Sequence, residues 1–209
     1  MTLYDRILGN PWVYDKVRPF VVGGFSAYQQ AFNWLELQEQ DVLLDIGCGT
    51  GAAFNFLQHA GPYHGFDLDT RALERFRTVH TGTNVHLHSH YITEKDIEAI
   101  RPSKVLMIGL IHHLDDRDAS ALLALLRRGG QVQKVITLDT VYIRGKWINN
   151  VLAALDRGRY VRTEEEYRRF FSAASWSPSQ SAILRSGNGA ACYFASCLEP
   201  PGAANRLAA

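Results

Sequence analysis

Long apolar runs are missing from this sequence of 209 residues, and cysteine is scarce, at three positions. The longest uninterrupted apolar segment, residues 105–111, is far shorter than the roughly 20 residues that cross a bilayer. Asp5, Arg6 and Asp15 interrupt the start of the chain, so no signal peptide is expected. Three cysteines do not make a secreted disulfide scaffold, and we expect a soluble protein of the reducing cytoplasm.

An excess of one charge is also missing, because 22 lysines and arginines oppose 21 aspartates and glutamates. This balance creates no long-range field to hold nucleic acid or an anionic membrane, so neither is expected as a partner. The hydrophobic fraction of 46% and the charged fraction of 21% are ordinary for globular proteins and exclude a disordered or collagen-like chain. The length fits one domain with its own core.

Short apolar strands alternate with helical patterns, which predicts crossover connections and a parallel sheet. Strands are expected at residues 42–46, 63–66, 85–91, 105–110 and 132–142. Helices are expected after Ser26, at 52–59, after Thr70, from Asp115 and Asp116, at 147–155 and from the capping box at 163–166. Two last strands, near 181–185 and 190–197, flank the hairpin turn 186–189, so an antiparallel edge closes the sheet.

Finer signals concern two of these helices. The hydroxyl of Thr70 is expected to cap the helix that follows it. In the helix that begins at Asp115 and Asp116, Leu122, Leu125 and Leu126 are expected to form the buried stripe, which Gly129-Gly130 ends.

A glycine-rich loop, made of Gly47, Cys48, Gly49, Thr50 and Gly51, lies between a buried strand and a predicted helix. Missing side chains let a ligand approach the backbone, and amides at a helix N-terminus face it. The spacing also satisfies the relaxed dinucleotide fingerprint, with Asp67 about 20 residues further on. Asp67 can accept two hydrogen bonds from the ribose of either NAD or S-adenosylmethionine, so the spacing leaves both ligands open.

Asp45 distinguishes between these two ligands. A carboxylate so close to the glycine loop suits a ligand that carries an ammonium group better than a pyrophosphate, which it would repel. S-adenosylmethionine carries both an ammonium and a sulfonium group.

Three segments in order resemble the class I S-adenosylmethionine-dependent methyltransferases. Residues 42–51 are similar to the family's first motif almost letter for letter, Gly65-Phe66-Asp67-Leu68-Asp69 to its second, and residues 109–116 to the strand-four segment of its small-molecule members. The resemblance covers about residues 25–140. It implies an α/β, Rossmann-like fold with a seven-stranded, mostly parallel sheet, an antiparallel last strand and helices on both faces.

The resemblance also implies a cofactor, S-adenosylmethionine, with S-adenosylhomocysteine as its product. Asp45 and the loop from Gly47 to Gly51 would hold the methionine part, Asp67 the ribose, and Leu68 would lie against the adenine. The family often has an acidic residue after strand three, where this chain has Ser89-His90-Tyr91. Stacking by Tyr91 or a backbone contact would substitute for it. Gly109, in the strand-four segment, is assigned to the same cofactor site.

Methyl transfer is an in-line displacement, so positioning supplies most of the catalysis and a base is needed only where the acceptor must lose a proton. Our candidates are His112 as base or orienter, with Tyr14, Tyr142 and Arg157 lining the acceptor side. The acceptor is expected to be a small molecule with an oxygen or nitrogen nucleophile.

The domain organisation follows from the same reading. Residues 1–24 are expected to form either a lid over the methyl donor or a helix packed on the outside. Residues 25–199 form the methyltransferase domain, and residues 200–209 form a disordered tail.

Other readings of the sequence remain open. The Tyr-x-x-x-Lys spacing of Tyr142 and Lys146 is that of an NAD(P)-dependent oxidoreductase, but Gly145 interrupts the helix that this pair requires. A protein that binds S-adenosylmethionine without methylating would carry the same loop. His86, His88 and His90 alternate along a predicted strand and share one face, yet they lack a fourth ligand, so no metal site is expected.

Overall fold

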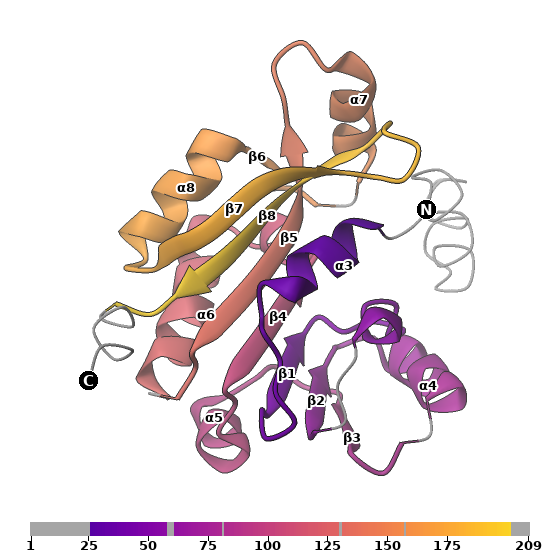
Figure 1. Ribbon diagram of the computed structural model, residues 1–209, viewed down its shortest axis with the longest axis vertical. Helices are drawn as coiled ribbons and strands as arrows, with labels where there is room; N and C mark the ends of the chain where they lie inside the picture. The colour runs from indigo at the N-terminus through magenta and orange to yellow at the C-terminus, as the bar shows by residue number, and fades with distance from the viewer. Residues whose placement is uncertain (1–25, 58–60, 81, 130, 157, 202–209) are drawn as a thin grey trace.

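A mixed sheet with helices on both faces organises the computed structural model, which describes residues 26–57, 61–80, 82–129, 131–156 and 158–201 (Figure 1). The strands are β1 (Leu43–Ile46), β2 (Tyr63–Phe66), β3 (Val85–His88), β4 (Lys104–Ile108), β5 (Lys134–Tyr142), β6 (Arg162–Thr163), β7 (Ser177–Arg185) and β8 (Cys192–Glu199). The helices are α3 (Ser26–Asn33), α4 (Thr70–Val79), α5 (Glu94–Ile100), α6 (Asp116–Arg128), α7 (Trp147–Leu155) and α8 (Glu164–Ala173), with short 3-10 helices η1 (Phe54–Phe56) and η2 (Ile111–His113).

The strand order is β3-β2-β1-β4-β5-β8-β7, and the short β6 pairs with β5 outside this path. Strands β1 to β5 pair in parallel with one another, whereas β8 is antiparallel to both β5 and β7. The predicted α/β fold with an antiparallel strand near the end of the chain is therefore confirmed. None of the described helices is long and apolar enough to cross a membrane.

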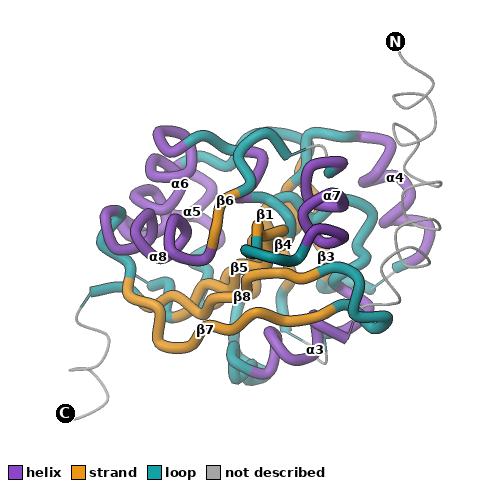
Figure 2. The backbone as a smooth tube through the Cα atoms, turned by 90° about the horizontal axis from the view of Figure 1, so that it is seen from above, coloured by secondary structure: helices purple, strands orange, loops and turns teal. Residues whose placement is uncertain are grey.

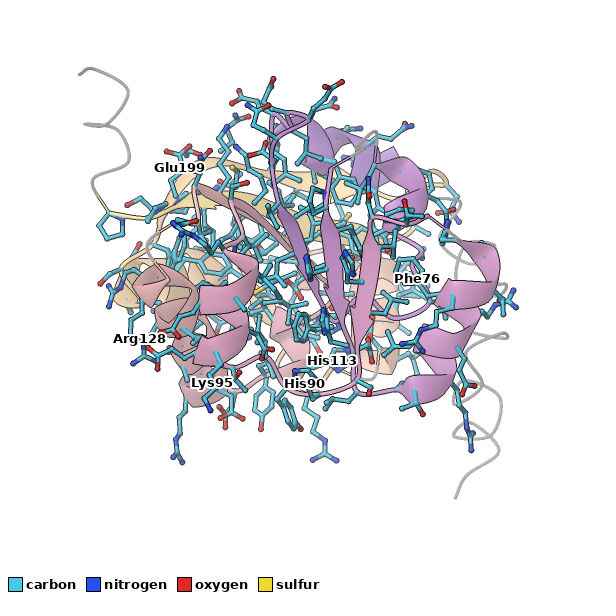
Figure 3. The ribbon with its side chains drawn as sticks, turned by 90° about the horizontal axis from the view of Figure 1, so that it is seen from below. Phe76, His90, Lys95, His113, Arg128 and Glu199 are labelled. Atoms are coloured by element: carbon cyan, nitrogen blue, oxygen red, sulfur yellow. The ribbon has the colours of Figure 1, made fainter. Side chains whose placement is uncertain are left out.

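Two hydrophobic clusters fill the space on the two faces of the sheet. One unites Ile97 of α5, Leu126 of α6 and Phe171 of α8, and the other unites Phe32 of α3 with Phe76 of α4. Figure 2 shows α3 on the opposite side of the sheet from α5, α6 and α8. In Figure 3, Arg128 on α6 and Phe76 on α4 flank the strands from opposite sides. The central strands are thus buried on both faces, as their apolar runs predict.

The segment after the glycine loop differs from its prediction. A helix was expected over residues 52–59, but the described part holds only the 3-10 helix η1, and residues 58–60 lie outside the described ranges. The ring of Phe54 packs on Tyr63 and Phe76, with centroids 4.8 and 5.4 Å apart.

Local capping chemistry is confirmed at several helices and wrong at one. The capping box of Thr163 and Glu166 opens α8, and Asp115 caps α6. In α4 the cap is Asp69, whose Oδ1 accepts hydrogen bonds from two backbone amides, while Thr70 is the first helical residue. Aspartate and threonine are both good N-caps, and the aspartate takes the position here.

One strand boundary and one helix face also differ from expectation. The strand predicted over 85–91 ends at His88, and the buried stripe of α6 is formed by Ala119, Leu123 and Leu126. Leu122 and Leu125 are only partly buried and line the cavity described below. The Ser186–Gly189 turn joins β7 to β8 as predicted, with Gly189 at a φ of 73°.

Candidate functional site

The glycine loop follows β1 at the carboxyl end of the sheet, where ligands bind in open parallel sheets. Gly47, Gly49 and Gly51 have φ values of 78°, 54° and 79°, a region that side chains other than glycine's rarely adopt. A Cβ atom at Gly51 would lie 2.9 Å from the ring of Phe76. The amide of Gly47 donates to the carbonyl of Phe66 at 2.7 Å, which fixes the loop against the end of β2. Backbone geometry therefore requires these glycines.

Asp67, just beyond β2, lies directly beside this loop. Its Oδ2 accepts a hydrogen bond from the amide of Gly49 at 2.8 Å, and its Oδ1 accepts one from the amide of Asp69 at 2.8 Å. Each carboxylate oxygen can accept a further bond. The side chain is thus held in one orientation with capacity left for ligand hydroxyl groups.

Asp45 lies in β1 beneath the loop and is only 1% exposed. Its Oδ2 accepts a hydrogen bond from the Tyr63 hydroxyl at 2.6 Å, while its Oδ1 is buried without a hydrogen-bond partner among the described residues. Burial raises the pKa of Asp45 to about 7, against the Tyr63 bond that lowers it, and the charge of Asp67 adds to the rise. An unpartnered buried acceptor at this place fits a ligand that brings N–H donors.

A cavity of about 730 Å³ opens beside Asp67. Its walls come from the ends of β1 and β2, the segment after β3, the segment after β4 and one side of α6, and they include Ile46, Gly47, Phe66, Asp67, Leu68, Tyr91, Ile92, Leu110, Leu122 and Leu125. Leu68 and Tyr91 are 51% and 77% exposed, so large apolar surfaces here are open to a flat apolar ligand group. Gly109 directly follows β4 and has a φ of 67°.

Cys48 serves a packing role in the loop. Its side chain is buried, and a Cβ atom at Gly65 would lie 2.8 Å from its sulfur. Burial raises the pKa of the Cys48 thiol well above its usual range, so the reactive thiolate is disfavoured.

His112, in η2 after β4, is 1% exposed and lies between two carboxylates. Its Nδ1 is 2.8 Å from Oδ1 of Asp139, which also accepts the His112 backbone amide at 3.1 Å. Its Nε2 is 3.4 Å from Oδ1 of Asp156. Burial opposes the charged form, but the hydrogen bonds and charges of both aspartates outweigh it and raise the pKa of His112 to about 9.

The chain after α7 covers His112. The amide of Tyr160 donates to the His112 carbonyl at 2.9 Å, and a Cβ atom at Gly158 would clash with the His112 ring. Arg162 holds this segment in place through its contacts with Asp116 and with backbone carbonyls. Asp139, Asp156 and Arg162 thus belong to a network that sequence reasoning missed.

One signal in the sequence did point to Asp139. It is a charged residue inside the apolar run of β5, and a buried carboxylate requires a partner. The sequence does not predict which residue is that partner, because His112 is distant from Asp139 along the chain.

Of the other acceptor-side candidates, the structure describes Tyr142 alone. Tyr142, at the end of β5, is half-buried. Tyr14 and Arg157 lie outside the described residues, as do residues 1–24 of the predicted N-terminal segment and 202–209 of the predicted tail. Lys146 precedes α7 as its N-cap while Tyr142 belongs to β5, so this pair does not share a helix.

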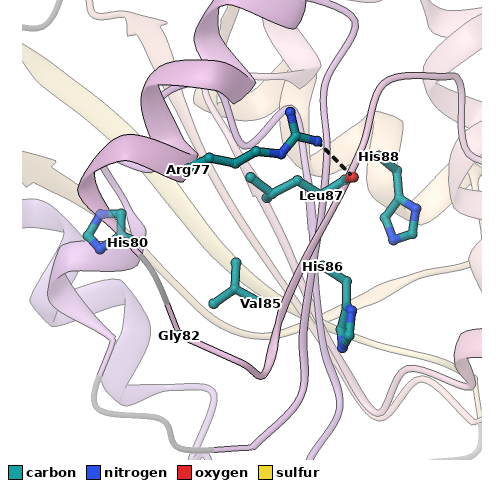
Figure 4. A pocket seen from close by; sticks show the side chains of 7 residues that line it. All are labelled: Arg77, His80, Gly82, Val85, His86, Leu87 and His88. Carbon is teal, nitrogen blue, oxygen red and sulfur yellow. Dashed lines mark hydrogen bonds between the residues drawn. The ribbon is translucent and has the colours of Figure 1, made fainter.

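In the predicted row of histidines, His86 and His88 lie on the edge strand β3, and His90 lies beyond its end. His64 of β2 stacks on His86 and His88 of β3, and its Nδ1 is 3.2 Å from Nε2 of His88. Burial and the two neighbouring imidazoles lower the pKa of His64 to about 4. His86 and His88, with Arg77 and His80, line a surface pocket of about 490 Å³ (Figure 4). Within the described ranges, these rings do not converge as a set of three metal ligands.

Comparison with known proteins relates this fold and its glycine loop to a family. Residues 43–130 match the model of a family described as a methyltransferase domain. No curated protein matches the chain.

Several solved structures of similar fold are methyltransferases by name. The 1,6-didemethyltoxoflavin-N1-methyltransferase of Burkholderia thailandensis, with bound S-adenosylhomocysteine, has a TM-score of 0.64 at 16% identity over 90% of this chain and 86% of that one. The magnesium protoporphyrin IX methyltransferase of Synechocystis, also with bound S-adenosylhomocysteine, has 0.60 at 15% identity over 83% of each chain. Geranyl diphosphate C-methyltransferase of Streptomyces coelicolor has 0.62 at 11% identity over 83% and 76%. At such identities the likeness shows a common fold.

Proposed function

We propose that this chain is a class I S-adenosylmethionine-dependent methyltransferase and that it transfers a methyl group to a small-molecule acceptor with an oxygen or nitrogen nucleophile. The assignment of the cofactor rests on one observation. The Oδ1 atom of Asp45, which is buried and has no hydrogen-bond partner among the described residues, lies beneath the glycine loop, whose glycines have left-handed backbone angles and which Asp67 flanks. The near-neutral charge supports a small acceptor over nucleic acid.

Different residues of this chain would bind different parts of the cofactor. S-adenosylmethionine, when bound, supplies an electrophilic methyl group on a sulfonium centre. Asp45 would accept hydrogen bonds from the ammonium group, with the backbone of Gly47–Gly51 beside it. Asp67 would accept the ribose hydroxyls, and Leu68 and Tyr91 would enclose the adenine in the apolar cavity.

On the acceptor side we assign His112 an orienting role in preference to that of a general base. Both of its ring nitrogens face carboxylates and its side chain is buried, so it does not present a basic nitrogen to the methyl acceptor. Tyr142, Tyr14 and Arg157 remain our candidates for contacts with the acceptor, and residues 1–24 for a lid that excludes water.

Cofactor affinity should depend on pH through Asp45. Its pKa of about 7 leaves the carboxyl largely protonated at pH 6, and only the ionised form pairs with an ammonium group. The association constant of S-adenosylhomocysteine is expected to rise roughly eightfold between pH 6 and pH 7.5 and then to level off, with proton release on binding below pH 7. Calorimetric titration across this range measures the effect. Asp45→Asn keeps the side-chain volume and should give a flat profile; an equal slope in that variant would assign the titration to another group.

The decisive test of the function compares cofactors. Purified protein is titrated with S-adenosylmethionine, S-adenosylhomocysteine and NADH, and we expect the first two to bind with dissociation constants on the order of micromolar and NADH not to bind. Asp45→Ala and Asp67→Ala should weaken binding, whereas Glu98→Ala, which removes an exposed carboxylate on α5, should not. Binding of NADH alone would replace the proposal with an oxidoreductase.

Methyl transfer itself requires a second assay. Small acceptors are screened for release of S-adenosylhomocysteine. A protein that binds the cofactor tightly yet converts none of a broad set of oxygen and nitrogen nucleophiles would be a binding module.

A further inference from the structure

Three side chains with metal-binding atoms converge where η2 meets the end of α7. His112 and His113 belong to η2, and Asp156 directly follows α7. One ligand atom from each of them lies within 4.8 Å of the others. These residues lie far apart in the sequence, and the crossover after β5 brings them together.

Neighbouring groups prepare His112 as a ligand. Its Nδ1 is hydrogen-bonded to the buried carboxylate of Asp139, which leaves Nε2 directed toward Asp156. Metal-binding histidines in proteins usually donate their other ring N–H to a carboxylate, a backbone carbonyl or a water, which fixes the ring and its tautomer. Asp139 therefore occupies the place of the supporting residue in a carboxylate–histidine–metal arrangement.

The distances agree with a transition-metal ion. Nε2 of His112 and Oδ1 of Asp156 are 3.4 Å apart. Two ligands with bonds of about 2.1 Å to one tetrahedral ion are separated by roughly the same distance. The ring of His113 lies with its centroid 4.3 Å from that of His112 and tilted by 37°, and one of its ring nitrogens lies within 4.8 Å of the ligand atoms of His112 and Asp156.

We propose that His112, His113 and Asp156 bind a divalent transition-metal ion of the Zn²⁺ type, supported by Asp139. Two imidazoles and one carboxylate suit zinc or its neighbours in the first transition row and not magnesium, which prefers oxygen ligands. Three protein ligands leave at least one coordination position for water or for an oxygen of another molecule. The site does not depend on the proposed methyl transfer.

A proton is the competing occupant. Without a metal, His112 can hold a proton on each nitrogen and form ion pairs with Asp139 and Asp156. The two occupants differ at His113, which contributes a ligand to the metal site and is not needed for the ion pairs. His113 is exposed, so its replacement should leave the fold intact.

The test uses untagged full-length protein, stripped with EDTA and titrated with Co²⁺ and Zn²⁺. Visible absorption reports Co²⁺ coordination, and competition with a chromogenic chelator gives the Zn²⁺ affinity. One equivalent should bind, and His113→Ala and Asp156→Asn should each weaken binding at least about tenfold. His86→Ala, in the imidazole row of β3, is the matched control and should leave the affinity unchanged. Circular dichroism checks that each variant is folded.

Three outcomes would overturn the site. They are the absence of Co²⁺ and Zn²⁺ binding by the wild-type protein, binding that survives both His113→Ala and Asp156→Asn, and loss of binding in His86→Ala. S-adenosylhomocysteine titrations on the same stripped samples separate this result from that of the proposed function, because the cofactor residues are not metal ligands.

Discussion

Replacement of Asp67 by alanine should weaken S-adenosylhomocysteine binding on the order of 100-fold. Hydrogen bonds to a charged group contribute about 1.5–3 kcal/mol each, and two ribose hydroxyls at the lower value give about 3 kcal/mol. Each 1.4 kcal/mol is about tenfold in affinity. Asp67 is also held by the amides of Gly49 and Asp69, so its loss frees the glycine loop as well. Calorimetric titration measures the change.

Asp67→Asn serves as the matched variant. It keeps one carbonyl oxygen as acceptor and the shape of the side chain, and it should lose about tenfold in affinity, between the wild type and Asp67→Ala. Thermal melting should change little in either variant, because Asp67 lies at the edge of the cavity and not in the core. An affinity of Asp67→Ala within about threefold of the wild type would contradict the ribose assignment.

The sequence predicts the cofactor side well because its signals are local. The apolar run of β1, the glycines with left-handed backbone and the acidic residue after β2 follow one another within a short stretch. The hairpin of Ser186–Gly189 and the capping box of Thr163 and Glu166 are likewise read from adjacent residues. Each is fixed by backbone chemistry that neighbours in sequence supply.

Other features depend on residues that are distant in sequence. His112 obtains its environment from Asp139 and Asp156, which the order of strands places beside it. The helix α5 was not predicted, since it is short and Ile97 is its one buried residue among those described. Thr70 and Asp69 could each cap α4, and tertiary geometry selected Asp69. Where two adjacent residues can both cap a helix, the packing of the helix decides which of them does so.

Replacement of Arg162 by alanine should produce the largest loss of stability. The guanidinium donates to Oδ1 of Asp116 at 2.6 Å and to the carbonyls of Ile111, Leu114 and Tyr160 at 2.9–3.2 Å. It also lies over the ring of Phe170, 5.3 Å from its centroid. Truncation removes a charged donor from these three carbonyls, of which only that of Ile111 has a second donor among the described residues, the Leu114 amide, and it removes the packing on Phe170. We expect a loss of about 3–5 kcal/mol in the free energy of unfolding. For a chain of this size that corresponds to a fall of roughly 10–15 °C in Tm.

Arg168→Ala is the control that separates the effect of removing a buried arginine from the effect of removing a positive charge. Arg168 pairs with Glu164 one helical turn away on a partly exposed side of α8, where such pairs contribute less than about 1 kcal/mol. Like Arg162, it lies over an aromatic ring, that of Phe194, 5.3 Å from its centroid, so the two variants lose a similar ring contact. Arg162→Lys keeps the charge but lacks the planar fork, so it should melt between Arg162→Ala and the wild type. If Arg162→Ala melted as Arg168→Ala does, water would be satisfying the three carbonyls and the arginine would not be fastening η2 to α8. The two variants should therefore differ in what they lose. Asp67→Ala should lose cofactor affinity at constant Tm, because Asp67 contacts the ligand at the edge of the cavity. Arg162→Ala should lose Tm, because Arg162 holds the chain that covers His112.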